Sequence, residues 1–380
     1  MKENILFGSG TVAEKNLNLN PSFIVDNNID LQGTLFHGVP VFSADKLKNN
    51  SEKYNVIICT TSVGEVKKQL ESYGYTWGLN AKVADLLVER MEMSNLEERK
   101  FNFLISSGLP SSAESFSGGG IYKVEETEYY PKITKVYEGN THGLIKTNEG
   151  FAFACQGKGI IFLNDELEEV NVIELRQGLR PHGIRRYKDL WILVSSYKDA
   201  IIAIDDSGKE IFEYKFSSKI DSFESAQHHC NDLDIVGDYA YVSMFSITGN
   251  WKRNSFDGGI MEVNLITGEM KPINNNLTMP HSITCDETGL KVLNSFKGTF
   301  LGNNFNVLAT LPGFVRGYDS DDEYYYLGES KNRNFSRMET GRTPVSIDTK
   351  ITIINKKHGF CRSIHLPMPI SEVHSVLKIS

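Results

Sequence analysis

From Phe101 onward the sequence repeats one pattern, and this repetition limits the possible folds more than any other feature of the chain. Each repeat reads as a strand, a polar turn, a second strand rich in β-branched and aromatic residues, a loop and a third strand. Five such units are visible, and they align on "THGLIKTNEGFAFACQG", "PHGIRRYKDLWILVSSY", "CNDLDIVGDYAYVSMFS", "PHSITCDETGLKVLNSF" and "VRGYDSDDEYYYLGESK". Consecutive units of this kind predict blades of a β-propeller.

A sixth unit is divided between two distant parts of the chain. The segment "EVHSVLKIS" near residue 380 reads as a first strand without a second, whereas "FNFLISSG", "GGGIYKVEE" and "ITKVYEG" read as later strands without a first. Joined together, these segments complete a blade and leave no unpaired sheet edge. We therefore predict a six-bladed β-propeller over residues 101–380, closed by pairing of the C-terminal strand with the first propeller strands.

The residue at the start of each first strand is the strongest functional signal. In a propeller these strands line the central channel, so their first residues gather at one mouth. The six equivalent positions are His142, His182, Asn231, His281, Arg316 and His374. Histidine takes four of them although the chain contains only nine histidines. His228 and His229 lie just before Asn231 and could reach the same mouth, but a shift of one residue reverses the direction of a strand side chain.

Basic residues form a second ring. Just after the second strand, four blades place a lysine, namely Lys158, Lys198, Lys297 and Lys331. Together with Arg180 and Arg316 they predict a positive mouth on a protein whose net charge is -8. Such a mouth attracts an anion, and arginine binds carboxylate or phosphate with two parallel hydrogen bonds. One loop insertion contributes Trp251, a candidate for stacking on a sugar. A second loop insertion contributes Arg333, Arg337 and Arg342.

Three chemistries fit a histidine-rich mouth. A divalent metal (Zn, Mn, Fe or Ni) could be bound by His142, His182, His229 and His281 and would polarise a carboxylate or carbonyl. Without metal, His142, His182, His281 and His374 could act with Arg316 as acid–base catalysts of elimination or epimerisation at a uronic acid. The third alternative is a binding module or scaffold for an anionic glycan or nucleotide-sugar. We favour the metal-dependent lyase or isomerase, with Lys158, Lys198, Lys297, Lys331, Arg180, Asn231 and Trp251 contacting the substrate.

The first part of the chain has a different pattern. "NILFGSGTVAEK" is a short apolar strand that runs into Gly8, Gly10 and Ala13, and "SFIVDNN" is a second strand ending at Asp26. Glycines at this spacing let the backbone approach a phosphate. We predict a small α/β, Rossmann-like domain over residues 1–78 and a helical connector over residues 79–100. The domain has too few strands for both halves of a dinucleotide fold, so no NAD is expected.

Two parts of the chain resemble known protein families. "ILFGSGTVAEK", "FIVDNN", "LQGTLFHGVPVFS" and "NVIICTTS" resemble the Rossmann-like N-terminal domain of bacterial nucleotide-sugar acyltransferases. That resemblance implies that Gly8, Gly10 and Asp26 lie near the nucleotide of a nucleotide-sugar. "FLISSGLPSSAESFSGGGIYKVE" and "RPHGIRRYKDLWILVSSYKDAI" are similar to an uncharacterised bacterial propeller family described only as a domain of unknown function. More distant six-bladed lyases also gather histidines around a metal at the axis, which is an analogy only.

The composition of the chain indicates its cellular location and the classes of partner that it can bind. Five cysteines without a CxxC pair favour a reduced, cytoplasmic location. The acidic net charge argues against nucleic-acid binding, and no long apolar run or secretion signal indicates membrane insertion. We therefore expect a cytoplasmic protein that acts on a small anionic sugar or nucleotide-sugar in bacterial surface-glycan metabolism and polysaccharide biosynthesis. Its N-terminal domain is a candidate for forming a homo-oligomer.

Overall fold

The chain folds into two compact units, residues 1–99 and 100–380. The fold is that of a computed structural model, which describes residues 2–109, 118–223, 225–253, 256–331 and 345–379. The second loop insertion was predicted to contribute three arginines to the mouth. They lie outside the described residues and are Arg333, Arg337 and Arg342. Within the described residues, no helix has both the length and the apolar character needed to cross a membrane.

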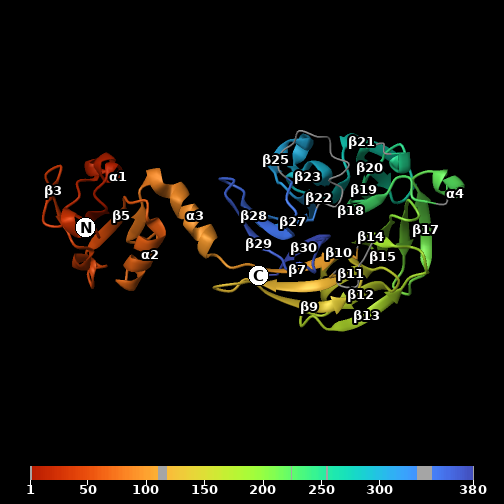
Figure 1. Ribbon diagram of the computed structural model, residues 1–380, viewed down its shortest axis with the longest axis horizontal. Coiled ribbons are helices and arrows are strands. Elements are labelled where there is room, and N and C mark those ends of the chain that lie inside the picture. Colours follow the sequence, from red (N-terminus) through yellow and green to blue (C-terminus); the bar gives the residue numbers. More distant parts are fainter. Residues whose placement is uncertain (1, 110–117, 224, 254–255, 332–344, 380) are drawn as a thin grey trace. The chain divides into compact units, whose positions relative to one another are not determined.

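The first unit contains one six-stranded sheet with three helices (Figure 1). The sheet order is β3-β4-β2-β1-β5-β6, and all neighbouring strands are parallel except the β3–β4 pair. The elements are β1 (Glu3–Phe7), α1 (Thr11–Lys15), β2 (Phe23–Val25), β3 (Leu35–Phe36), β4 (Val39–Phe42), β5 (Tyr54–Ile58), α2 (Val63–Ser72), β6 (Ala81–Val83) and α3 (Val88–Glu98). Apolar runs such as Ile5–Phe7 and Val56–Ile58 are buried, as expected for central parallel strands.

The segment predicted as a helical connector, residues 79–100, belongs to this first unit. It supplies β6, which pairs with β5, and α3, which contacts α2. The connector prediction recognised the helical pattern of α3, but a strand of three residues is too short to show an alternating pattern. The sheet consequently contains one more parallel strand than the sequence indicated.

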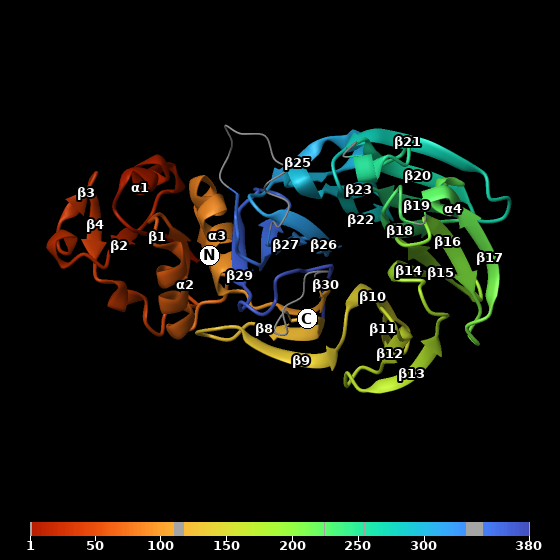
Figure 2. The ribbon, with the colours of Figure 1, turned by 45° about the vertical axis from the view of Figure 1, so that its right-hand side comes forward.

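The second unit is a six-bladed β-propeller of four-stranded antiparallel sheets (Figure 2). Blades 1 to 3 consist of β10 (Thr141–Thr147), β11 (Gly150–Cys155), β12 (Gly159–Leu163) and β13 (Glu169–Glu174); β14 (Pro181–Tyr187), β15 (Leu190–Ser195), β16 (Ala200–Ile204) and β17 (Glu210–Lys215); and β18 (Cys230–Val236), β19 (Tyr239–Met244), β20 (Gly258–Asn264) and β21 (Met270–Leu277). A short helix, α4 (Lys219–Phe223), joins blades 2 and 3. Blades 4 and 5 consist of β22 (Pro280–Asp286), β23 (Gly289–Asn294), β24 (Thr299–Leu301) and β25 (Val307–Thr310); and β26 (Phe314–Ser320), β27 (Tyr324–Ser330), β28 (Lys350–Asn355) and β29 (Cys361–His365).

Blade 6 combines distant segments in the order β30 (Ser375–Lys378), β7 (Asn102–Ser107), β8 (Gly120–Glu125) and β9 (Lys132–Glu138). β30 pairs antiparallel with β7, and its neighbours around the axis are β10 and β26. The first strands of all six blades thus contact one another in a ring, whereas fourth strands such as β13, β17 and β21 lie outside (Figure 2).

Apolar side chains between neighbouring blades form the propeller core. One cluster joins blades 2 and 3 through Ile192, Val194, Leu233 and Val242, and a similar one joins blades 1 and 2. Both faces of each blade are covered, so the second strands read as nearly continuous buried runs, such as β11 and β15. This rigid packing fixes the starts of the six first strands relative to one another.

Candidate functional site

An irregularity in the first strands directs side chains into the mouth of the channel. In blades 1 to 5 the pairing between the first and second strands shifts register at equivalent places, which are His142/Ile145, Pro181/Ile184, Cys230/Leu233, His281/Thr284 and Val315/Tyr318. A β-bulge of this kind bends the strand and re-aims its side chains. The predicted ring positions 142, 182, 231, 281 and 316 all lie at these bulges, and His374 immediately precedes β30.

The bulges also explain why glycine follows histidine in the first two blades. Gly143 has a φ of 58°, and a Cβ there would lie 2.4 Å from the backbone oxygen of His182. A Cβ at Gly183 would lie 2.9 Å from the backbone nitrogen of Leu233 in the next blade. The first strands approach one another too closely for a side chain at these two positions, so only glycine fits after each histidine.

Five histidine rings gather at this mouth among the described residues. The ring of His142 stacks on that of His182 with centroids 4.2 Å apart, and it contacts the ring of His374 edge-on at 4.1 Å. His182 lies 6.3 Å from both His229 and His374. His281 is further round the ring and packs against Phe245 at 5.2 Å and Phe314 at 5.6 Å.

His229, rather than His228, faces the mouth. The ring of His229 packs on Phe245 at 4.3 Å and on Trp251 at 5.6 Å. His228 turns into the protein, where its ring nitrogens contact the Ser246 carbonyl oxygen at 2.9 Å and the Ser217 hydroxyl at 2.8 Å. The choice between the two, which the sequence left open, is decided by Asp199.

The buried carboxylate of Asp199 holds this turn. It accepts hydrogen bonds from the backbone N–H groups of Gln227, His228 and His229. His229 has a φ of 52°, a left-handed conformation that is unfavourable for a residue with a Cβ. Three hydrogen bonds to one charged acceptor stabilise that conformation and so direct the His229 ring to the mouth.

In each blade, a second mouth residue lies two positions earlier in the sequence than the predicted ring residue. These residues are Asn140, Arg180, His229, Met279, Phe314 and Glu372. Asn140 Oδ1 lies 3.1 Å from His142 Nε2, Glu372 Oε2 lies 3.0 Å from His374 Nε2, and the guanidinium of Arg316 lies over the ring of Phe314. Sequence reasoning identified Arg180 and His229 but missed Asn140 and Glu372. A two-residue period would have found them, because such residues share one face of a strand.

Glu372 connects the arginine and the histidines. Its Oε1 lies 3.3 Å from Arg316 Nη1 in an ion pair whose side chains are only 6% and 4% exposed. His374 Nδ1 lies 3.1 Å from His142 Nδ1, and His142 Nε2 also lies 3.3 Å from the amide nitrogen of Gln156. These contacts form one continuous array from Arg316 to Gln156.

Lowered pKa values favour the neutral form of His142, His182, His281 and His374. Burial is the main cause that holds the pKa of His142, His182 and His281 well below the ordinary value, and neighbouring histidines and Arg316 add to the effect. Burial also lowers the pKa of His374, although the hydrogen bond to Glu372 opposes this shift. A neutral imidazole can accept a proton and can coordinate a metal.

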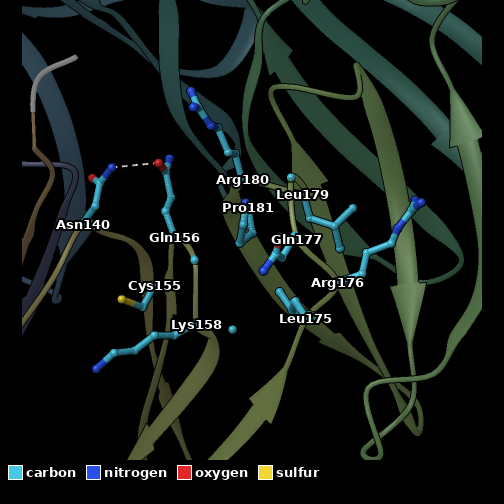
Figure 3. A pocket seen from close by; sticks show the side chains of 13 residues that line it. Asn140, Cys155, Gln156, Lys158, Leu175, Arg176, Gln177, Leu179, Arg180 and Pro181 are labelled. Atoms are coloured by element: carbon cyan, nitrogen blue, oxygen red, sulfur yellow. Dashed lines mark hydrogen bonds between the residues drawn. The ribbon is translucent and has the colours of Figure 1, made fainter.

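A pocket of about 390 Å³ opens between blades 1 and 2 at this mouth (Figure 3). It is called the mouth pocket below, and its polar lining includes Asn140, Gln156, Lys158, Arg176 and Arg180. The Asn140 amide donates a hydrogen bond of 2.7 Å to Gln156 Oε1, shown as a dashed line in Figure 3. Lys158 lies here as predicted, and its ammonium group donates to the Tyr137 hydroxyl.

The two arginines of the mouth pocket differ in their partners. Arg176 forms ion pairs with Glu210 and Glu213 at 2.6 and 3.2 Å. The guanidinium of Arg180 lies over the ring of Tyr197, 4.2 Å from its centroid. Within the described residues Arg180 forms no ion pair, so its charge is available to a ligand.

Aromatic side chains of blades 3 and 4 line another part of the mouth. Trp251 contacts Phe245 and Phe256, and Phe256 in turn stacks on Phe296. Trp251 is half-buried, which leaves part of its ring exposed. The loop insertion of blade 3 therefore places an aromatic wall beside His229 and His281.

The remaining predicted residues are more scattered. Lys297 and Lys331 are exposed and Lys198 is half-buried, each on the loop after a second strand. Asn231 is buried, and its amide donates to the carbonyl oxygens of His229 and Pro280. Within the described residues, no group of three or more His, Cys, Asp or Glu side chains is arranged to hold a metal ion. The metal set His142, His182, His229 and His281 therefore stays a prediction.

The predicted nucleotide residues of the first unit have internal roles. Both oxygens of Asp26 accept hydrogen bonds, from the Ser9 backbone and hydroxyl and from the Asn28 backbone. Gly8 packs against Thr60, where a Cβ would lie 3.1 Å from the threonine Cβ. Gly10 immediately precedes the five-residue helix α1, and a Cβ there would meet nothing within 4 Å. Gly8 and Asp26 therefore shape the loop after β1.

Comparisons with known proteins give a family but no activity. A family model described as a domain of unknown function (DUF4915) matches residues 176–380, more than half of the chain. The chain therefore belongs to this family, and no curated protein matches it. A chain of a nidogen/laminin complex is 13% identical, with a TM-score of 0.49 over 74% of this chain and 98% of that one. A candidate 6-phosphogluconolactonase from Bacteroides fragilis is 11% identical, with a TM-score of 0.46 over 74% of this chain and 99% of that one. Likenesses at this level indicate neither a ligand nor a reaction.

Proposed function

We propose that this member of the DUF4915 family binds an anionic sugar at the propeller mouth and catalyses proton transfer next to the sugar's carboxylate, as a lyase or isomerase. The observation that carries the proposal is the state of His182. Within the part of the chain that the structure describes, its ring forms no hydrogen bond, whereas the rings of His142, His281 and His374 all do.

His182 has the properties of a general base. Its ring is half-buried rather than enclosed, so a ligand can reach it. Its pKa lies well below the ordinary value, mainly because of burial and then because of His229 and His374, so the ring is unprotonated at neutral pH. The stacked ring of His142 limits its orientation. An oriented, neutral imidazole is the group most often used to remove a proton in enzymes.

The two walls of the mouth favour a sugar as the ligand. The exposed part of Trp251 offers a flat apolar surface, which suits the C–H face of a pyranose ring. The amides of Asn140 and Gln156 suit hydroxyl groups, and the guanidinium of Arg180 suits a carboxylate or phosphate. A hexuronate or a nucleotide-linked hexuronate carries all three features.

The proposed step conserves atoms and charge. The C–H bond next to the carboxylate breaks, the proton moves to a ring nitrogen of His182, and the electron pair is delocalised onto the carboxylate, whose charge Arg180 stabilises. Loss of the substituent on the next carbon, which takes a proton as it leaves, gives the unsaturated product of a lyase. Return of a proton to the opposite face gives the product of an epimerase, and His281, which packs on Phe245, is the candidate donor.

The first unit, taken by itself, is proposed to bind a nucleotide. Its parallel strands run in the order β4-β2-β1-β5-β6, so β2 and β4 extend the sheet on one side of β1, whereas β5 and β6 extend it on the other. Ligands of open α/β sheets bind beyond the carboxyl ends of the strands at this place. Here the loop after β5 carries Thr60 and Thr61, whose hydroxyl and backbone N–H groups suit phosphate.

Exchange of substrate hydrogen with deuterium tests the proposal. Wild-type protein would be incubated in D₂O with glucuronate, galacturonate and their nucleotide-linked forms, and loss of the proton next to the carboxylate would be followed by NMR. We expect His182→Gln to lower the exchange rate about 10²-fold or more, and His365→Gln, a change at an exposed histidine, to leave it unchanged. Exchange at the wild-type rate in His182→Gln would refute the role of His182. Binding without exchange in wild-type protein would favour the binding-module alternative, in which charge reversal at Lys198 and Lys297 abolishes affinity.

A further inference from the structure

We propose that Glu372 is a positioning residue that fixes the tautomers of His374 and His142 and thereby decides which hydrogen atoms the wall of the mouth pocket presents. The inference rests on the proposed function for its effect on turnover. The tautomers themselves are measurable without a ligand, so failure of the one idea is distinguishable from failure of the other.

The array begins at a buried carboxylate that can only accept hydrogen bonds. Glu372 Oε1 faces Arg316, whose guanidinium is charged at any physiological pH, and the ion pair keeps the carboxylate ionised. Its other oxygen, Oε2, lies 3.0 Å from His374 Nε2. Because an ionised carboxylate has no hydrogen to donate, the proton of this hydrogen bond must be on His374 Nε2.

The tautomer of His374 then determines the tautomer of His142. A neutral His374 with its proton on Nε2 has a lone pair on Nδ1, which lies 3.1 Å from His142 Nδ1. Two lone pairs at this distance would repel, so His142 carries its proton on Nδ1 and donates it to His374. His142 Nε2 is left with a lone pair directed at Asn140 and Gln156.

The side-chain amides of Gln156 and Asn140 are oriented in the same way, because each donor must face an acceptor. Gln156 Nε2 lies 3.3 Å from His142 Nε2 and donates to its lone pair, while Gln156 Oε1 accepts from the Asn140 amide at 2.7 Å. Asn140 Oδ1 accepts from the backbone N–H of Leu109 at 2.9 Å. Asn140 and Gln156 line the mouth pocket, so their orientation determines the donors and acceptors that a sugar hydroxyl meets.

One contact in this arrangement is unfavourable. Asn140 Oδ1 and His142 Nε2 lie 3.1 Å apart, and both are acceptors in the tautomer set by Glu372. The opposite tautomer of His142, with its proton on Nε2, would turn this contact into a hydrogen bond. The amide end of the array thus does not select the tautomer that we infer, and the selection must come from Glu372.

Charged groups around the two rings do not replace Glu372. His142 is faced by His182, His281 and Arg316, none of which accepts its Nδ1 proton in the structure. His374 is also near Asp232, but the Oδ2 atom of Asp232 accepts the backbone N–H of Ser282 at 2.7 Å.

Exchanging the carboxylate for an amide should invert the whole array. In Glu372→Gln the amide oxygen faces Arg316 and the amide N–H₂ donates to His374 Nε2. His374 then carries its proton on Nδ1 and donates it to His142 Nδ1, and His142 carries its proton on Nε2 and donates it to Asn140 Oδ1. Gln156 loses its acceptor on His142, and the donor pattern of the mouth pocket changes.

The test is long-range ¹H–¹⁵N NMR of protein labelled at histidine, which distinguishes protonated from unprotonated ring nitrogens. Spectra of His142→Gln and His374→Gln assign the two rings. We expect wild-type protein to carry the His142 proton on Nδ1, Glu372→Gln to carry it on Nε2, and Glu372→Asp, which keeps an acceptor-only carboxylate, to match the wild type. A wild-type His142 protonated on Nε2 would overturn the inference even if Glu372→Gln does not fold, and so would an unchanged tautomer in a folded Glu372→Gln.

The activity readout is separate. If the hexuronate exchange reaction is found, Glu372→Gln should lower its rate about 10²-fold or more, and Glu372→Asp should lower it less. Equal losses in the two variants would mean that Glu372 acts by packing alone and would contradict a role through the tautomers.

Discussion

The ring of His182 stacks on the ring of His142, with 4.2 Å between the centroids and 22° between the planes. Two imidazolium cations cannot share this arrangement without strong repulsion, and burial already disfavours the charged form of each. Folding therefore holds both rings, together with His281 and His374, in a state that binds fewer protons than the unfolded chain does.

This stacking predicts that the protein loses stability as the pH falls below about 6.5, the ordinary histidine pKa. The folded-state pKa values of these histidines are lowered, so in this range the unfolded state binds more protons and the free energy of unfolding rises with pH. Each histidine that stays neutral contributes a loss of roughly 1 kcal/mol between pH 6.5 and 5.5. Urea denaturation at pH 7.5, 6.5 and 5.5 measures it, and the double variant His142→Gln/His182→Gln should show a smaller loss. An equal loss in the double variant would show that other groups cause the acid sensitivity.

The glycine after His142 predicts a large difference between two alanine substitutions. Gly143 has a φ of 58° and no room for a Cβ, because the His182 carbonyl oxygen would lie 2.4 Å away. Gly157 also has a positive φ, 83°, but a Cβ there meets nothing within 4 Å. We expect Gly157→Ala to lower the free energy of unfolding by about 1–2 kcal/mol, the cost of the left-handed conformation, and Gly143→Ala to lower it by about 3 kcal/mol or more. Urea midpoints compare the two, and similar values would contradict the close approach of the first strands.

The repeat pattern predicted the propeller and the positions of its mouth residues well. Alternating strands with polar turns are a local property, and the equivalent positions follow once the blades are aligned, so His142, His182, His281 and His374 could be placed together. The β-bulge in the first strand of blades 1 to 5 could not be predicted from the sequence, because only two of these blades have a glycine after the histidine.

Residues that act through tertiary contacts were missed. Glu372 reads as an ordinary polar residue before a strand, and only the meeting of blades 5 and 6 brings its carboxylate to Arg316. Asp199 lies in blade 2 but holds a turn of blade 3. In the first unit, the glycine spacing indicated a phosphate loop, whereas Gly8 packs against Thr60, which follows a strand much later in the chain. Such long-range contacts have no local signature in the sequence.

The position of Asp199 predicts a strong effect of a small change. Its carboxylate accepts three backbone N–H groups, and Asp199→Asn leaves too few acceptors for these buried donors. We expect a loss of about 2–4 kcal/mol in the free energy of unfolding, since each unsatisfied buried donor costs about 1–3 kcal/mol. Asp206→Asn is the control, because Asp206 is 67% exposed and should cost less than about 1 kcal/mol. Thermal unfolding of both variants checks the expectation, and a milder effect at Asp199 than at Asp206 would refute it.

The two arginines of the mouth pocket should differ in their contribution to ligand binding. The guanidinium of Arg176 is occupied by Glu210 and Glu213, whereas that of Arg180 lies over Tyr197 and, within the described residues, has no carboxylate partner. A ligand carboxylate can therefore pair with Arg180 without displacing a partner. We expect Arg180→Gln to weaken glucuronate binding about 10-fold or more, since a hydrogen bond to a charged group contributes about 1.5–3 kcal/mol, and Arg176→Gln to change it little. Titration calorimetry at low and high salt measures both, and the Arg180 contribution should fall as salt screens the charge. Equal effects of the two substitutions would mean that the general positive potential of the mouth, rather than a specific pairing with Arg180, attracts the ligand.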